Sequence, residues 1–170
     1  YKGLAVVTEL DDTAPAWFAG DPHHIGQVLL NLLSNAVKFT DKGQITVRAS
    51  TIERAPKLSL LRVEVIDTGI GIVHAKQEKI FEAFSQADDS ITRVYGGTGL
   101  GTTIAKQLVS LMGGTIGLES AVGVGSNFWF ELPLRQAQPV GLDLTSCPDA
   151  LPAIPFAAKT PSTPASIYKI

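Results

Sequence analysis

The sequence predicts an α+β fold with helices on one face of a mixed sheet, because its elements follow the order strand, helix, two strands, helix, two strands. An amphipathic segment at residues 22–39 carries its apolar side chains on one side of a helix. Two pairs of strand-like segments follow, each pair joined by a turn. One sheet covered by at least two helices accommodates all of these elements.

Both long helices have local start or stop signals. The helix at 22–39 begins with Asp21 as its N-cap and with Pro22 in its first turn, where proline is tolerated. A second helix is expected at 100–112, because the glycine pair at 113–114 ends it. A shorter helix is expected around residues 79–84.

The strands are recognised by apolar and β-branched composition between turn residues. We expect the second and third to pair antiparallel across a turn containing Pro56, and the last two to flank the turn at 122–125. The expected strands are residues 4–10, 45–50, 58–66, 115–119 and 127–132. An irregular polar segment at 85–98, flanked by glycine, has the composition of a mobile lid.

Composition sets the domain organisation and excludes several functions. Residues 1–135 form the expected domain, and residues 136–170 have the proline- and alanine-rich composition of a linker or tail. The net charge of −2 argues against a nucleic-acid partner. The single cysteine and three scattered histidines do not suggest a disulfide or zinc site. No apolar run reaches the length of a membrane span, so we expect a cytoplasmic domain without direct membrane contact.

One stripe of the first helix is rich in amides. Gln27, Asn31, Asn35 and Lys38 are expected opposite the apolar side. A face that only meets water usually carries Glu, Lys and Arg, whereas amide oxygens can ligate Mg²⁺ and a lysine can meet phosphate. The alternative interpretation is an ordinary solvated polar face.

Two glycine-rich segments are candidates for nucleotide contact. Asp67 ends an apolar strand before Gly69 and Gly71, so its carboxylate can accept a hydrogen bond from an exocyclic amine such as that of adenine. The segment 96–101 opens the later helix with free backbone N–H groups, which favour phosphate. The alternatives are a strand-terminating turn and a flexible helix-capping loop.

Five motifs in order resemble the sequence boxes of bacterial sensor histidine kinase catalytic domains, in the superfamily shared with gyrase, a heat-shock chaperone and mismatch-repair ATPases. They are residues 31–40 (N box), 67–71 (first glycine box), 81–84 (F box), 96–101 (second glycine box) and 120–133 (last glycine box and closing strand). The resemblance covers essentially the first 135 residues. It implies a two-layer α+β sandwich of the Bergerat type, with a mainly antiparallel sheet and a mobile ATP lid.

The resemblance also implies the ligands, ATP and Mg²⁺, and a role for each matching residue. Asn35 would ligate Mg²⁺ with Asn31 beside it, and Lys38 would meet phosphate. The expected nucleotide contacts are Phe39 and Asp67 at the adenine, Gly69, Gly71 and Ile72 beside it, Arg93 in the lid, Gly97, Thr98, Gly99, Leu100 and Gly101 at the phosphates, and Ser126. The alternative for Arg93 is a solvated loop arginine.

The identity of residue 31 favours a kinase over an ATPase. The superfamily's ATPases carry a water-activating glutamate at this position, whereas the amide of Asn31 cannot act as a general base. The resemblance therefore implies phosphoryl transfer to a histidine on a separate dimerisation hairpin, a hybrid subgroup with a receiver domain or response regulator as partner, and a monomeric fragment. A degenerate module that binds nucleotide or protein without transfer is the alternative.

Overall fold

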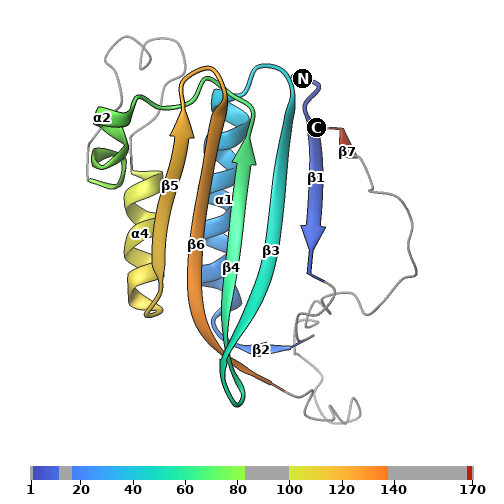
Figure 1. Cartoon of the computed structure of the whole chain (residues 1–170), viewed down its shortest axis with the longest axis vertical. Helices are drawn as coiled ribbons and strands as arrows, with labels where there is room; N and C mark the ends of the chain where they lie inside the picture. Colours follow the sequence, from blue (N-terminus) through green and yellow to red (C-terminus); the bar gives the residue numbers. More distant parts are fainter. Residues whose placement is uncertain (1, 12–16, 83–99, 138–167, 170) are drawn as a thin grey trace, which may run out of the picture.

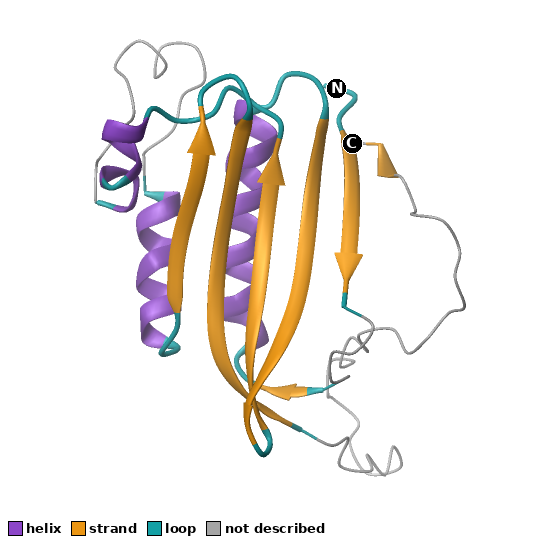
Figure 2. Ribbon diagram, viewed as in Figure 1, coloured by secondary structure: helices purple, strands orange, loops and turns teal. Residues whose placement is uncertain are grey.

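The computed structural model describes residues 2–11, 17–82, 100–137 and 168–169. In this part of the chain, one seven-stranded sheet carries both long helices on the same face (Figures 1 and 2). The helices are α1 (Pro22–Phe39) and α4 (Gly101–Leu111), with the short α2 (His74–Gln77) and the 3-10 turn η1 (Lys79–Phe81) near one end of the sheet. The expected two-layer α+β architecture is therefore present.

The sheet is mixed and mainly antiparallel, as expected. Its order is β2-β6-β4-β3-β1-β7, with β5 also paired to β6. Only β1 and β3 pair in parallel; the other pairings between described strands are antiparallel. The strands are β1 (Ala5–Leu10), β2 (Phe18–Ala19), β3 (Gln44–Ala55), β4 (Leu58–Asp67), β5 (Thr115–Ala121), β6 (Gly125–Gln136) and β7 (Tyr168–Lys169).

The helix boundaries follow the signals in the sequence. The Asp21 carboxylate accepts hydrogen bonds from the backbone N–H groups of His23 at 2.9 Å and His24 at 3.1 Å, so it caps α1. At the other long helix, Gly113 has a φ of +74°, and the N–H of Gly114 donates to the carbonyl of Val109 at 2.9 Å. A left-handed residue after the last turn is the usual way for a helix to end.

The core lies between the sheet and the two long helices. Every second residue of the two central strands points toward the helices, which is the period of a strand. Phe128, Phe130 and Leu132 of β6 pack there with Val63 and Val65 of β4. The helices contribute Val28, Leu32 and Ala36 from α1, and Ala105 and Val109 from α4.

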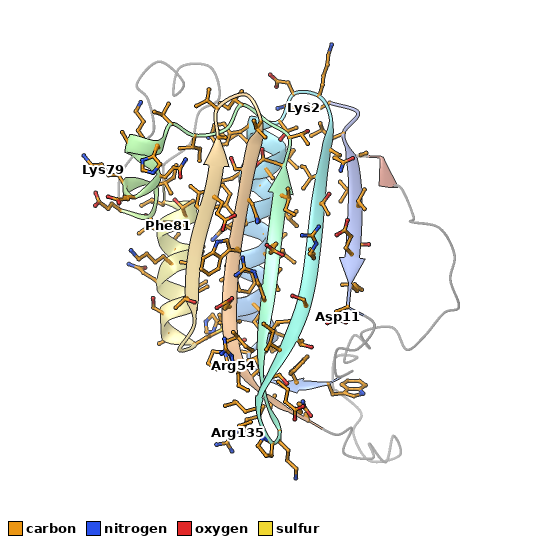
Figure 3. All side chains as sticks on the ribbon, viewed as in Figure 1. Lys2, Asp11, Arg54, Lys79, Phe81 and Arg135 are labelled. Carbon is orange, nitrogen blue, oxygen red and sulfur yellow. The ribbon has the colours of Figure 1, made fainter. Side chains whose placement is uncertain are left out.

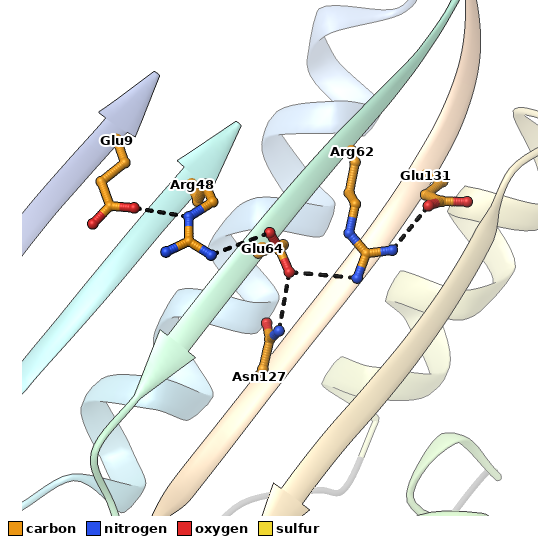
Figure 4. Close-up of polar contacts among 6 residues, drawn as sticks. All are labelled: Glu9, Arg48, Arg62, Glu64, Asn127 and Glu131. Atoms are coloured by element: carbon orange, nitrogen blue, oxygen red, sulfur yellow. Dashed lines mark hydrogen bonds and ion pairs between the residues drawn. The ribbon is translucent and has the colours of Figure 1, made fainter. Parts of the chain in front are cut away.

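The opposite face of the sheet is polar and pairs its own charges (Figure 4). Arg48 donates to Glu9 at 2.7 Å, and Arg62 donates to Glu131 at 2.9 Å. Glu64 lies between the two arginines, 3.7 Å from Arg48 and 3.4 Å from Arg62. Ion pairs thus link β1, β3, β4 and β6 across this face.

Three details differ from the expectations. Strands β3 and β6 have 12 residues each and extend beyond the expected ranges 45–50 and 127–132, because both pair with β4 along its length. The single short helix expected at 79–84 is instead α2 followed by η1, because Ile80 and Phe81 turn inward onto the core and the ring of Phe81 meets that of Phe128 edge-on at 6.3 Å. Strands β2 and β7 were not expected; β7 lies in the tail at 136–170 and pairs with β1. The segment expected at 85–98 lies outside the described residues.

Candidate functional site

The elements that carry most of the expected site residues begin or end toward one end of the molecule. The C-terminal end of α1, the end of β4, the turn between β5 and β6, and the start of α4 all lie at this end (the top of Figure 1). The antiparallel register explains part of the arrangement, because Asp67 at the end of β4 is paired with Ser126 at the start of β6.

Asp67 is a buried carboxyl, with only 5% of its surface exposed. Burial raises its pKa above the ordinary value, and hydrogen bonds from Gly69 and Ser126 partly offset this effect because they favour the ionised form. The backbone N–H of Gly69 donates to its Oδ1 at 2.8 Å. The structure thus holds a buried carboxylate acceptor at the end of β4, a central strand of the sheet.

The loop after Asp67 packs directly on the end of α1. The N–H of Ile70 donates to the carbonyl of Phe39 at 3.3 Å, and a Cβ on Gly69 would lie only 2.4 Å from that same oxygen. On the other side, the N–H of Gly123 donates to the carbonyl of Ile70 at 2.8 Å. The loop therefore joins the helix end to the turn between β5 and β6, and only glycine allows this approach at position 69.

Replacing Gly71 with alanine is expected to lower the free energy of unfolding by roughly 2 kcal/mol or more. Its φ is +69°, and an added Cβ would lie 2.0 Å from the carbonyl oxygen of Ala121. Gly123→Ala is the matched control, because Gly123 has a similar φ of +77° but no atom within 4 Å of the added Cβ. Urea unfolding at pH 7 measures both; equal losses would show that the contact with Ala121 contributes nothing.

The amide stripe of α1 lies on a flank of the helix and not opposite its apolar side, which corrects the expectation. Leu30, with 63% of its surface exposed, and Ser34 face outward, whereas Asn31 and Asn35 are half-buried. Gln27 is exposed and donates through Nε2 to Oδ1 of Asn31 at 3.3 Å. Asn31 and Asn35 are therefore less exposed than expected, because Leu30 lies on the most exposed side of the helix.

One atom of this stripe lacks a partner. Among the described residues, the buried Nδ2 of Asn31 makes no hydrogen bond. Rotating the amides of Gln27 and Asn31 together by half a turn keeps their mutual hydrogen bond and points the Asn31 oxygen to the unpartnered side. An amide oxygen in that position suits a hard cation such as Mg²⁺, so the residues present fit such an ion. The ammonium of Lys38 lies over the ring of Phe39, 4.8 Å from its centroid.

A serine pair, of which the sequence indicated only one member, supports the carboxylate. The hydroxyls of Ser126 and Ser120 are 3.0 Å apart, and the N–H of Ile72 donates to Ser120 at 2.8 Å. From α2, Nε2 of Gln77 donates to the carbonyl of Ile72 at 2.9 Å and to that of Ser120 at 2.8 Å. Ser120 and Gln77 therefore connect Asp67, through Ser126, to the loop and to α2. The register across the turn at 122–125 is the signal that could have identified Ser120.

The start of α4 is the last described part of the expected site. Leu100 is the N-cap of α4, and its side chain forms no capping hydrogen bond. The first backbone N–H groups of a helix favour phosphate. A Cβ on Gly101 would meet no atom within 4 Å. The hydroxyl of Thr102 donates to the carbonyl of Ile80 at 2.7 Å and so links α4 to η1. The expected contacts Arg93, Gly97, Thr98 and Gly99 lie outside the described residues.

One of the three histidines, His24, pairs with the residue that caps α1. His24 lies 2.8 Å from the Asp21 carboxylate at the start of α1, at the end remote from Asp67. No group of three or more His, Cys, Asp or Glu side chains within the described ranges could hold a metal ion. None of the described helices is long and apolar enough to cross a bilayer.

Comparison with known proteins gives three kinds of match. The model of the family described as histidine kinase-, DNA gyrase B- and HSP90-like ATPase matches residues 20–136. The chain is 47% identical over 140 residues to the sensory/regulatory protein RpfC of Xanthomonas campestris, which is 82% of this chain and 19% of RpfC. It is 52% identical over 118 residues to the sensor histidine kinase AruS of Pseudomonas aeruginosa, 69% of this chain and 12% of AruS. It thus spans less than a fifth of these curated relatives.

Solved structures with the same fold include full-length ShkA in complex with AMPPNP. That structure matches with a TM-score of 0.69 and 36% identity, over 80% of this chain and 27% of the ShkA chain. The catalytic domain of the histidine kinase ThkA matches with a TM-score of 0.60 and 28% identity, over 78% of this chain and 80% of that chain. The expected fold class is confirmed by both matches.

Proposed function

The chain belongs to the family of histidine kinase-, DNA gyrase B- and HSP90-like ATPases, and on this premise we propose that it binds Mg-ATP and transfers the γ-phosphate to a histidine on a separate helical hairpin. The observation that carries the proposal is the meeting of the buried Asp67 carboxyl, the 69–71 loop and the amide-bearing end of α1 at one end of the sheet. Two of the relatives with matching sequences are named as a sensor histidine kinase and a hybrid signal transduction histidine kinase.

The proposed roles follow the chemistry of each group. The Asp67 carboxylate accepts a hydrogen bond from the exocyclic amine of adenine, and Phe39 flanks the base. The amide oxygens of Asn35 and Asn31 hold Mg²⁺, which neutralises charge on the phosphates when it is bound. Lys38 meets a phosphate, as do the backbone N–H groups at the start of α4.

Transfer and hydrolysis differ in the group that attacks phosphorus. In the proposed reaction, a histidine nitrogen of the hairpin forms a bond to the γ-phosphorus while the bond to the bridging oxygen breaks, and ADP leaves. The resemblance matches Asn31 to the position where hydrolytic relatives carry a base, and the amide of Asn31 cannot take a proton from water. Positioning and charge neutralisation suffice for transfer, since the nucleophile comes from the partner.

The test supplies the histidine hairpin of the parent kinase in trans with ATP labelled on its γ-phosphate. We expect label on the hairpin, none on a hairpin whose acceptor histidine is replaced by glutamine, and little release of free phosphate by this chain alone. Nucleotide binding without label on the hairpin would instead identify a regulatory module. Steady phosphate release without the hairpin would identify an ATPase.

The remaining assignments belong to the parent protein. We propose a cytoplasmic kinase of the hybrid type, in which residues 1–135 are the catalytic domain and residues 136–170 lead toward a receiver domain. The hybrid histidine kinase of Dictyostelium discoideum that matches 93% of this chain supports this proposal. Partners are then the dimerisation hairpin and a receiver domain or response regulator, with no nucleic acid and with a monomeric fragment.

Adenosine affinity is expected to fall on acidification. Burial raises the pKa of Asp67, so this carboxyl gains its proton at a higher pH than an ordinary aspartate and then no longer offers a charged acceptor to the amine. Adenosine is the suitable ligand, because it has no phosphates that titrate. Its dissociation constant, measured by NMR titration from pH 7 to pH 4.5, should rise steadily; a flat profile would place the base away from Asp67.

A further inference from the structure

The side chain of Lys2 caps the C-terminal end of α1, although Lys2 is far from this helix end in the sequence. Its ammonium donates to the backbone carbonyls of Val37 at 3.1 Å, Lys38 at 2.9 Å and Thr40 at 3.2 Å. It also forms an ion pair with Asp41 at 3.1 Å. Figure 3 shows Lys2 at the end of the molecule where α1 stops and β3 begins.

These contacts complete the hydrogen bonding of the helix end. The last four carbonyls of a helix have no partner within it, and here the carbonyl of Ala36 accepts from the N–H of Thr40 at 3.1 Å. The carbonyl of Phe39 accepts from Ile70 at 3.3 Å. The carbonyls of Val37 and Lys38 accept from Lys2. Helices commonly end with a left-handed glycine that satisfies these groups, whereas Thr40 is extended, with a φ of −108°.

The helix end held in this way carries much of the candidate site. Asn35, Lys38 and Phe39 lie on the last turn and a half of α1. A cation at a helix C-terminus also interacts favourably with the helix dipole. A lysine that served only to fix the start of β1 would need one partner; this one directs its donors at three carbonyls around the C-terminal end of α1.

We propose that Lys2 is a positioning residue of the nucleotide site, which sets the last turn of α1 so that Asn35 and Lys38 face Mg²⁺ and phosphate. This inference rests on the proposed function. The inference predicts that the metal and phosphate contacts depend on Lys2. The adenine contacts should not depend on it, because Ile70 holds the Phe39 carbonyl and Gly69 holds the Asp67 carboxylate.

The test compares Lys2→Met, Lys2→Arg and Lys42→Met in the full chain. Methionine keeps most of the lysine stem and removes the donors and the charge. Lys42 is an exposed lysine close to the same helix end, so Lys42→Met makes the same change in net charge without touching the α1 carbonyls. Dissociation constants for Mg-ATP and for adenosine are measured well below the unfolding temperature of each variant.

Lys2→Met is expected to weaken Mg-ATP binding roughly fivefold and to leave adenosine binding unchanged, because it loosens only the metal and phosphate side. Lys2→Arg should restore most of the Mg-ATP affinity, and Lys42→Met should match the wild type. If Lys2→Met and Lys42→Met bind Mg-ATP equally well, then Lys2 has only a structural role, even if Lys2→Met melts at a lower temperature. If the wild type binds adenosine but not Mg-ATP, or neither ligand, then the proposed function fails and this inference with it.

Discussion

Replacing Asp67 with asparagine is expected to weaken ATP binding roughly 10- to 100-fold, the cost of losing a hydrogen bond to a charged acceptor in a buried site. The preference for ATP over GTP should fall as well, because the carboxylate selects the exocyclic amine of adenine. Calorimetric titration with both nucleotides measures these effects. Glu53→Gln, an exposed change on β3 at the far end of the sheet, is the control and should leave both affinities intact.

The same substitution is expected to stabilise the nucleotide-free domain at pH 7. The folded-state pKa of Asp67 is raised, so its contribution to stability is present below the unfolded-state pKa and is lost as the pH rises through the folded-state pKa. At pH 7 the folded protein therefore holds a buried charge that asparagine removes. The midpoint of urea unfolding should rise at pH 7 and change little at pH 3. A lower midpoint at pH 7 would mean that the hydrogen bonds of the carboxylate outweigh its burial.

Replacing Asn35 with alanine is expected to abolish the contribution of Mg²⁺ to ATP binding, because the helix loses its proposed metal ligand. The affinity measured with Mg²⁺ should fall by more than about tenfold, to the value that the wild type shows in EDTA. Ser34→Ala is a matched control on the same helix turn, because Ser34 is exposed and lies outside the site. Alanine favours the helix at both positions, so neither change should unfold the domain. An unchanged Mg²⁺ dependence would remove Asn35 from the site.

The sequence predicted the elements that short-range signals define. Asp21 and Pro22 set the start of α1, the glycines at 113–114 end α4, and the turn at Pro56 joins two strands that pair antiparallel. Asp67 and its glycines were identifiable for the same reason, since a polar residue that ends an apolar strand before glycines is visible without knowledge of the fold.

Features that depend on distant contacts were not predictable in this way. Strand β2 has two residues, Phe18 and Ala19, and exists because they pair with the end of β6. The division of the expected short helix into α2 and η1 depends on how Phe81 packs against Phe128. Ser120 accepts from Ile72 and Lys2 donates to Lys38, and both contacts join residues far apart in the sequence.

Calorimetric titration of the full chain with AMPPNP, in Mg²⁺ and in EDTA, tests the central claim most directly. If Asn35, Asp67 and the start of α4 form one site, the chain binds one equivalent of AMPPNP in Mg²⁺ and binds it much more weakly in EDTA. No binding in Mg²⁺, or equal binding in both buffers, would contradict this account.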